Sequence, residues 1–400
     1  MAQKRSKIMA FYFLIMLFWM ALYAYMPILS THSAGLGADS VMVGTIISSY
    51  GFTQMLLRIP LGILSDKIGR RKPFVILGAF LTALSSLGLG LANTPVLLML
   101  FRGLAGAAAA TWVTYTVLFS SYFKPEESPQ AMTFANAFNN GGQIIAMLLG
   151  GFLAGKIGNQ AAFFLACTFG AGAIILSFLI AENRPQGGTR LTVKALLSVG
   201  LDKNLLFVSL LAIFYQVVSQ GTTMGFIPTF ATEIGATKTQ LGTITSVTVA
   251  GSVLTSLIAS KFLIARFGTR RLVIIGQIIA TTASMLLPWV AGNVWILFAM
   301  QFVVGLGGGL NYPVLMGLAI KNIQSEKRGA AMGFFQSIYA LGMFIGPLIT
   351  GWLTKIAAAG GLSTLESLQV GLTVVSAIGI PALILSILFL DKIPGNQKKG

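Results

Sequence analysis

The chain has 400 residues, of which 55% are apolar and only 9% are charged. Soluble domains carry roughly 25% charged residues, so this composition excludes a water-soluble enzyme and predicts an integral membrane protein. The net charge of +17 would suggest a nucleic-acid partner in a soluble protein, but the basic residues lie in alternate loops between apolar runs, which excludes that partner as well.

Apolar runs of about 20 residues recur from one end of the chain to the other. The first follows a short basic stretch, residues 1–7, and it is too long for the core of a signal peptide, so we interpret it as the first span. Backbone groups in lipid must be hydrogen-bonded within their own segment, which makes every span helical. The twelve predicted spans are residues 8–30, 42–65, 73–92, 95–120, 130–153, 161–182, 204–231, 240–265, 272–291, 294–320, 329–354 and 367–390.

The basic residues predict the side of the membrane on which each loop lies. One set of alternate loops, together with both termini, holds most of the 27 Lys and Arg residues, whereas the other set holds only Lys156, Lys238 and Lys355. Loops that stay in the cytoplasm retain Lys and Arg. The sequence therefore predicts a multi-pass protein of the cell membrane with both termini in the cytoplasm.

The two halves of the chain share features at a nearly constant offset of 199 or 200 residues. Examples are Gly69 with Gly268, Arg71 with Arg270, Gly106 with Gly305, Met132 with Met332 and Gly151 with Gly351. This order indicates an internal duplication, of the kind found in transporters that rock about a central site. We expect an all-α integral membrane protein whose twelve transmembrane helices form two pseudo-symmetric six-helix bundles. The bundles are residues 1–182 and 204–400, joined by a cytoplasmic linker at 183–203 with a short surface helix over residues 189–201.

The loop after the second span, residues 62–72, reads GILSDKIGRRK. A carboxylate at a helix end beside a compact basic turn can form charge-assisted contacts in one conformation and lose them in another. Basic residues that only fix topology are the alternative, but they explain neither the carboxylate nor the glycines. The second half has Ala265 in place of the carboxylate, so a gate is expected in the first half only. The predicted gate residues are Gly62, Asp66, Lys67, Gly69, Arg70 and Arg71.

This loop and the duplicated layout resemble the major facilitator superfamily, in particular its bacterial twelve-helix drug and metabolite exporters. The resemblance covers residues 8 to 391 and implies a secondary transporter that works by alternating access. In the fourth span, Arg102 begins the sequence RGLAG, which is similar to the family motif Arg-x-x-Gln-Gly with Ala105 in place of Gln. The resemblance associates Arg102 with proton coupling. The fifth span lacks the proline of the family's antiporter motif, which argues against proton exchange.

Two arginines lie inside predicted spans, where a charge costs at least about 2.5 kcal/mol and normally faces a cavity. For Arg102 the alternative is a packing role in which it caps a neighbouring carbonyl. Arg58 follows Tyr50 and Gln54 at four-residue steps, and the same stripe continues to Asp66. Arg58 therefore either binds a ligand or neutralises Asp66 along the helix.

Other polar side chains are spaced to share one face of each helix, and they lie at matched depths in the two halves. Such a set predicts a polar cavity on the pseudo-symmetry axis. Interhelical hydrogen bonds, worth about 0.6 kcal/mol each, are the alternative for any one of them. The predicted coupling and substrate cavity comprises Arg102, Arg58, Gln54, Tyr115, Asn136, Asn140, Gln143, Gln216, Gln220, Gln301, Tyr312, Gln336 and Tyr339.

The sequence offers little for other chemistry. Asp66 lies at the cytoplasmic end of the second span, so no carboxylate is placed as a proton relay at mid-membrane. The other nine acidic residues lie in loops or at span ends: Asp39, Glu126, Glu127, Glu182, Asp202, Glu233, Glu326, Glu366 and Asp391. His32 is the only histidine and Cys167 the only cysteine, which leaves no metal cluster and no nucleophile-and-base pair. No nucleotide-binding loop is present. We expect no enzymatic activity, no metal and no cofactor.

The predicted function is secondary active transport, as proton-coupled export of a small amphipathic compound or metabolite. Met and aromatic residues such as Trp19, Tyr23 and Trp112 can form an adaptable lining. The alternative is uptake of a small organic anion bound by the embedded arginines, since an Arg fork suits a carboxylate or phosphate. An alternative of another class is a non-transporting membrane sensor. The expected partners are the small-molecule substrate, protons and the lipid bilayer, and a monomer is expected.

Overall fold

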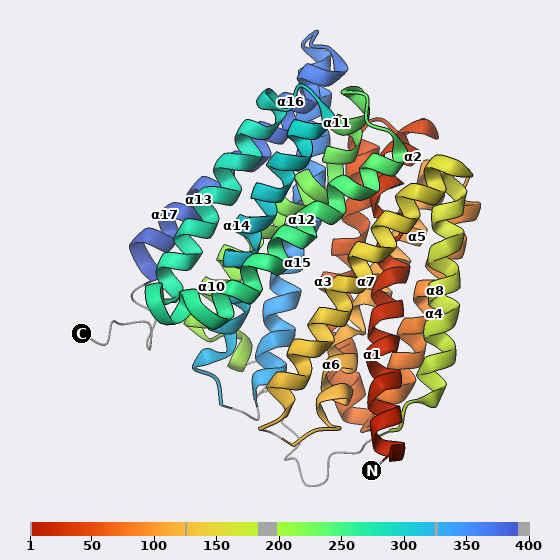
Figure 1. The fold of residues 1–400 in the computed structure, drawn as a ribbon, viewed down its shortest axis with the longest axis vertical. Helices are drawn as coiled ribbons and strands as arrows, with labels where there is room; N and C mark the ends of the chain where they lie inside the picture. Colours follow the sequence, from red (N-terminus) through yellow and green to blue (C-terminus); the bar gives the residue numbers. More distant parts are fainter. Residues whose placement is uncertain (1, 125, 183–197, 325–326, 391–400) are drawn as a thin grey trace.

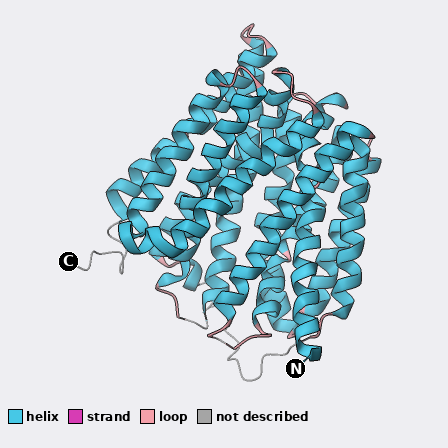
Figure 2. Ribbon diagram, in the orientation of Figure 1, coloured by secondary structure: helices cyan, strands magenta, loops and turns pink. Residues whose placement is uncertain are grey.

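The computed structural model describes residues 2–124, 126–182, 198–324 and 327–390. Over these residues the chain is helical and contains no β-strand (Figures 1 and 2), which confirms the predicted all-α fold. The surface helix expected over residues 189–201 and most of the linker lie outside the described residues. The helices are α1 (Ala2–Tyr23), α2 (Met26–Gly35), α3 (Ser40–Ile68), α4 (Lys72–Leu91), α5 (Pro95–Ala110), α6 (Trp112–Ser120), α7 (Ser128–Lys156), α8 (Asn159–Leu179), α10 (Lys203–Gly221), η1 (Thr222–Phe226), α11 (Ile227–Glu233), α12 (Lys238–Ile258), η2 (Ala259–Leu263), α13 (Ile264–Val290), α14 (Val294–Lys321), α15 (Arg328–Ala359), α16 (Thr364–Ala377) and α17 (Gly379–Phe389).

Among the described residues, eleven helical stretches are long and apolar enough to cross a membrane. Each coincides with one of the twelve predicted spans. The remaining predicted span, residues 130–153, is α7, which has 29 residues and is also long enough to cross. Asn136, Asn139, Asn140 and Gln143 lower its mean hydropathy. The least apolar of the predicted spans is therefore a helix rich in amides.

Several predicted spans consist of two helices in tandem. The first is divided between α1 and α2 just before Pro27, and the seventh is interrupted by the π-helical turn η1 just before Pro228. Proline lacks an amide hydrogen and fits the first turn of a new helix, so it marks both interruptions. The two prolines lie 201 residues apart, at equivalent places in the two halves. The fourth and twelfth spans are divided at Thr111 and Ile378.

The turn between the eighth and ninth spans is tighter than expected. The boundaries predicted from sequence leave a loop at residues 266–271, and within it only Gly268 has a non-helical backbone, where two helices meet at a kink inside α13. The kink lies at Gly268, whose φ of 75° is a left-handed conformation that side chains disfavour. Gly268 thus lets the chain turn between the eighth and ninth spans within a few basic residues, without a longer loop.

The first half of the chain, drawn red to yellow, lies beside the second half, drawn green to blue (Figure 1). The halves contact each other mainly through α3 against α15 and α7 against α12. Both contacts depend on glycine. A Cβ on Gly51 would lie 2.6 Å from the backbone nitrogen of Phe344, and a Cβ on Gly151 would lie 2.8 Å from the Cα of Gly242. Small residues are what allow membrane helices to approach this closely.

The two ends of the molecule differ in how the halves meet. Successive spans alternate in direction, so the first residues of α1 and the last of α17 lie on one face, which we call the termini face. At the opposite face, the far face, Ser40 Oγ donates to the carbonyl of Gly351 at 2.9 Å. There the ammonium of Lys355 also contacts Asp39 at 2.8 Å. The halves are therefore joined at the far face.

Candidate functional site

A cavity of about 620 Å³ lies between the two halves. On α7 its lining residues are Thr133, Phe134, Asn136, Ala137, Asn139, Asn140 and Gln143, and further lining residues lie between positions 248 and 257 of α12 and between positions 304 and 316 of α14. These are the parts of the three helices nearer the termini face, whereas the far-face parts of α7 and α12 pack against each other. The cavity therefore extends toward the termini face and is closed toward the far face.

Ten of the thirteen residues expected in the cavity line it: Gln54, Arg58, Asn136, Asn140, Gln143, Gln216, Gln220, Tyr312, Gln336 and Tyr339. The other three, Arg102, Tyr115 and Gln301, are not among the lining residues. The lining also contains residues that the sequence reasoning missed, namely Tyr215, Gln277, Thr281, Ser284 and Asn311. Gln277, Thr281 and Ser284 lie at i, i+4 and i+7 in the ninth span, and this spacing could have predicted that they share one polar helix face.

Arg58 is the only charged residue in the described lining. Its side chain is 2% exposed. Nη2 donates to the carbonyl of Ala109 at 3.1 Å, Nη1 lies 3.5 Å from the hydroxyl of Tyr339, and Nε has no partner. The carboxylate of Asp66 contacts Arg71 instead, so the ion pair proposed between Arg58 and Asp66 is not formed here. The guanidinium has hydrogen-bonding partners but no counter-charge.

Aromatic rings form much of the cavity wall on both sides of Arg58. In the second half, Tyr215 stacks on Tyr312 with ring centroids 5.5 Å apart, and Tyr312 meets Tyr339 edge to face at 5.7 Å. Trp19 and Trp112 line the first-half wall and contact each other at 5.1 Å. Such walls suit a planar apolar ligand.

Arg102 lies behind the cavity wall, and it is 3% exposed. Its guanidinium carbon is 4.1 Å from the ring centroid of Tyr50, a residue that does line the cavity. Nη1 donates to the hydroxyl of Tyr25 at 2.9 Å, and Nε has no partner. Arg102, on α5, thus contacts two other segments. Its hydrogen bond reaches Tyr25, between α1 and α2, and its cation–π contact reaches Tyr50 on α3.

The other two expected residues outside the cavity also have partners in the protein. The hydroxyl of Tyr115 donates to the carbonyl of Val75 at 2.8 Å. Oε1 of Gln301 accepts hydrogen bonds from Thr223 and Thr248 at 3.3 and 2.9 Å. Both side chains therefore hold helices together within one half.

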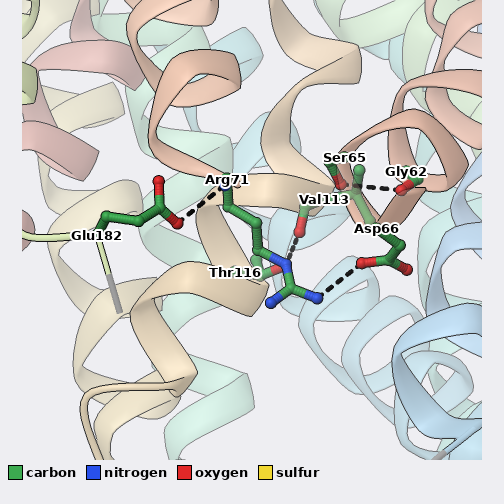
Figure 3. A network of polar contacts seen from close by, with 7 residues as sticks. All are labelled: Gly62, Ser65, Asp66, Arg71, Val113, Thr116 and Glu182. Atoms are coloured by element: carbon green, nitrogen blue, oxygen red, sulfur yellow. Dashed lines mark hydrogen bonds and ion pairs between the residues drawn. The ribbon is translucent and has the colours of Figure 1, made fainter. Parts of the chain in front are cut away.

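The basic turn after α3 forms a polar network (Figure 3). Gly69 ends α3 in the left-handed conformation with φ of 69°, which turns the chain sharply into α4. Arg71 Nη2 then reaches back to Asp66 Oδ1 at 2.7 Å, with the Asp66 side chain 53% exposed. The Asp66 carboxylate and the basic turn are thus in contact in this conformation, within one helix pair rather than across the two halves.

Glu182, just after α8, is a part of this network that sequence reasoning treated only as a loop acid. Its carboxylate accepts hydrogen bonds from the backbone amides of Arg71 and Lys72 at 3.0 and 2.8 Å. The first amides of a helix lack partners within it, and a carboxylate there is stabilised by the helix dipole. Glu182 therefore caps α4 and ties the end of the sixth span to the basic turn.

The corresponding turn of the second half is held differently. Arg270 donates from Nη2 to the carbonyl of Ile387 at 2.7 Å. Position 265 is alanine, as the sequence shows. Two other acids weighed from sequence, Glu326 and Asp391, lie outside the described residues.

The histidine and the cysteine, which could bind a metal or act as a nucleophile, lie apart from the cavity. The ring of His32 contacts Asn159 at 3.2 Å near the far face, and Cys167 is half-buried in α8. Within the described part of the chain, no three His, Cys, Asp or Glu side chains are grouped so that they could hold a metal ion.

The sequence matches the family model described as Major Facilitator Superfamily over residues 11–219 and again over residues 209–400. Among curated proteins, the inner membrane transport protein YajR of Escherichia coli K12 is 25% identical over 94% of this chain and 84% of its own length. The quinolone resistance protein NorA of Staphylococcus aureus is 23% identical over 88% of this chain and 90% of its own length.

Solved structures show the same fold. A bacterial homolog of the human lysosomal transporter Spinster, in an inward-facing and unoccupied conformation, aligns with a TM-score of 0.77 and 16% identity over 98% of both chains. The human organic anion transporter MFSD10 aligns with a TM-score of 0.70 and 15% identity over 96% of this chain and 99% of its own. At these identities the likeness concerns the fold alone.

Proposed function

The chain belongs to the Major Facilitator Superfamily, and from this premise we propose that it exports a small amphipathic compound that carries a negative charge. Membrane transport follows from the family. The substrate class and the direction are the proposal.

The observation that carries the proposal is the buried guanidinium of Arg58. It is the only charge in the described lining, and no carboxylate neutralises it. A hydrogen bond to a charged group contributes about 1.5–3 kcal/mol, and an uncompensated buried charge is destabilising. An anionic substrate would supply the missing counter-charge, while the tyrosine and tryptophan walls would hold its apolar part. A cationic compound would meet a like charge and no acid.

We propose alternating access between the halves 1–182 and 204–400 as the mechanism. In the present conformation the cavity extends toward the termini face, which the placement of Lys and Arg assigns to the cytoplasm. To release substrate at the far face, the halves must separate where α3 meets α15 and α7 meets α12. The contact of Asp66 with Arg71 would bias the equilibrium between the conformation open at the termini face and the conformation open at the far face. That the protein works as a monomer stays a prediction.

Three considerations support export rather than uptake. The cavity faces the side assigned to the cytoplasm, and one similar protein is named a quinolone resistance protein. An inside-negative potential also drives anions outward, by about 2.3 kcal/mol per charge at 100 mV. Proton coupling stays a prediction, because no Asp, Glu or His is in the described lining to carry the proton.

The test measures transport of a probe whose charge does not depend on pH. Purified protein in liposomes would be offered radiolabelled 4-methylbenzenesulfonate and, in parallel, benzyltrimethylammonium, with the membrane potential set by potassium and valinomycin. We expect saturable, potential-driven movement of the sulfonate only. A superimposed pH gradient would then show whether protons move as well.

The variants make the test specific for Arg58. We expect Arg58→Gln to raise KM for the sulfonate by about 10- to 100-fold, in line with the loss of one charged hydrogen bond. Arg58→Lys should lose less, because it keeps the charge but not the planar fork. The control is Arg5→Gln, the same change at an exposed position outside the cavity. Preference for the cation, or an unchanged KM in Arg58→Gln, would contradict the proposal.

A further inference from the structure

The cavity extends beyond its central part into the second half of the chain. We call this extension the inner lobe and define it by four polar residues: Gln277, Thr281 and Ser284 on α13, and Asn311 on α14. All four line the cavity and are more than nine-tenths buried, with Gln277 and Asn311 each 3% exposed. Its polar side chains thus lie inside one bundle, away from the interface between the halves.

Four buried polar atoms of the inner lobe lack hydrogen-bonding partners. Both Nε2 and Oε1 of Gln277 are buried and unpaired, as are Oγ of Ser284 and Oδ1 of Asn311. Inside a membrane protein an unpaired buried polar atom is strongly unfavourable, because no lipid group can replace its hydrogen bonds to water. Interhelical hydrogen bonds would be the ordinary role of such residues, but these atoms make none.

Small residues leave room for the inner lobe. Gly379 at the start of α17 faces α13, and a Cβ there would meet the side chain of Thr281. A Cβ on Gly308 would lie 2.8 Å from the hydroxyl of Tyr215. Larger residues at either position would displace the side chain of Thr281 or Tyr215, both of which line the cavity.

A row of aromatic rings connects the inner lobe with Arg58. Tyr215 stacks on Tyr312, Tyr312 meets Tyr339, and the hydroxyl of Tyr339 lies 3.5 Å from Arg58. Tyr312 directly follows Asn311 on α14. A planar molecule lying along these rings would therefore place one end at the cation and the other at the unpaired amides.

We propose that the inner lobe is a second subsite, which binds a neutral hydrogen-bonding group, a carboxamide or a hydroxyl, at the end of the substrate remote from its negative charge. This inference rests on the proposed function for the anionic end. The lobe residues are uncharged, so they select a neutral group. Gln277 offers both a donor and an acceptor, and the partner that satisfies both is another carboxamide.

The experiment compares two sulfonates that differ only at the end opposite the charge: 4-carbamoylbenzenesulfonate and 4-methylbenzenesulfonate. Transport of both would be measured in liposomes with the wild type, Gln277→Leu and Asn311→Leu. The biphenyl homologues of both probes would cover a longer span. The control is Gln160→Leu, the same change at an exposed position on α8.

We expect the carbamoyl probe to have a KM at least ten-fold lower than the methyl probe in the wild type and the control. In Gln277→Leu the difference should vanish or reverse, because a polar end group would then meet an apolar wall. Arg58→Gln should weaken both probes equally and keep their ratio, so the two proposals fail separately. A ratio that stays at the wild-type value in Gln277→Leu and Asn311→Leu would show a lobe filled by water only and would overturn the inference.

A second measurement covers variants that fold poorly and the case in which no sulfonate is transported. Benzamide and acetophenone have similar shapes, but only benzamide has amide hydrogens to donate. Benzamide should raise the Tm of the purified wild type and of Gln160→Leu more than acetophenone does, and this difference should be lost in Gln277→Leu. Equal shifts from the two compounds in the wild type would contradict the second subsite.

Discussion

At the scale of single residues, the two embedded arginines of the first half have different environments although their helices, α3 and α5, pack against each other. Arg58 lines the cavity and touches Tyr339 of the other half, whereas Arg102 is behind Tyr50 and touches only residues of its own half. Tyr50 separates the cation–π site from the cavity. We therefore assign substrate recognition to Arg58 and positioning of the wall to Arg102.

We expect Arg102→Lys to lower the maximal transport rate at least ten-fold and to change KM for 4-methylbenzenesulfonate less than two-fold. Lysine keeps the charge but cannot both stack on Tyr50 and direct a planar fork at Tyr25, and a desolvated cation–π contact is worth about 2 kcal/mol. Initial rates over a range of probe concentrations separate the two parameters. A raised KM with an unchanged maximal rate would instead place Arg102 in contact with the substrate.

The sequence alone predicts that embedded arginines are functional, because a charge in a span is unfavourable without a role. It does not predict which one faces the cavity. That depends on the rotation of each helix about its axis, and small residues such as Gly106, which packs against Tyr50, set this rotation through contacts between distant segments. Gln277 was missed for a similar reason: its spacing from Thr281 and Ser284 places the three on one helix face, but it does not tell which neighbour that face meets.

At the scale of helices, glycine contacts decide which end of the molecule is closed. α7 and α12 meet through Gly151 and Gly242 near the far face, and they diverge toward the cavity, where α7 carries amides and α12 carries serines and threonines. The sequence showed the spans and their pairing at an offset of 200. It did not show the interruption before Pro27 and Pro228, since a proline in a membrane helix is compatible with either a kink or a break.

We expect Gly151→Val to favour the conformation that is open at the far face. The Cβ of valine would lie 2.8 Å from the Cα of Gly242, and overpacking of this kind typically costs about 1–3 kcal/mol, which corresponds to a population shift of about five- to 150-fold. A cysteine in place of Thr239, in a Cys167→Ala background, would report far-face opening by its rate of labelling with an impermeant maleimide.

The matched control is Gly141→Val on the same helix, where a Cβ meets nothing within 4 Å. Labelling of Gly141→Val should stay at the level of the parent protein. If both valine variants accelerate labelling equally, the effect comes from the side chain in general and not from the α7–α12 contact.

At the scale of the whole molecule, the two halves hold together at the far face through backbone approach and a single described ion pair between them, Asp39 with Lys355. Both side chains are about half exposed, at 52% and 59%. Exposed ion pairs contribute about 0.2–1 kcal/mol, so this one adjusts the equilibrium between conformations without dominating it. The tight glycine contacts supply the larger part of the closure.

The last prediction concerns the pH dependence of this ion pair. The hydrogen bond from Lys355 and the one from the backbone amide of Met42 lower the pKa of Asp39 below its ordinary value. A lowered pKa means that the contribution to closure is complete above the ordinary carboxyl pKa of about 3.9 and is lost only as the pH falls through the lowered value. Between pH 5 and pH 8 the closure of the far face should therefore not change through Asp39.

Asp39→Asn removes the charge but keeps the cap on α3, since asparagine caps helices as well as aspartate does. We expect this variant, Lys355→Gln and the double variant to show the same modest increase in far-face labelling, about two-fold and smaller at high salt, because all three lose one exposed ion pair. Independent, additive effects of the two single changes would show that the pair does not couple the halves. A labelling rate that rises in the wild type between pH 8 and pH 5 but not in Asp39→Asn would contradict the sign derived from the pKa.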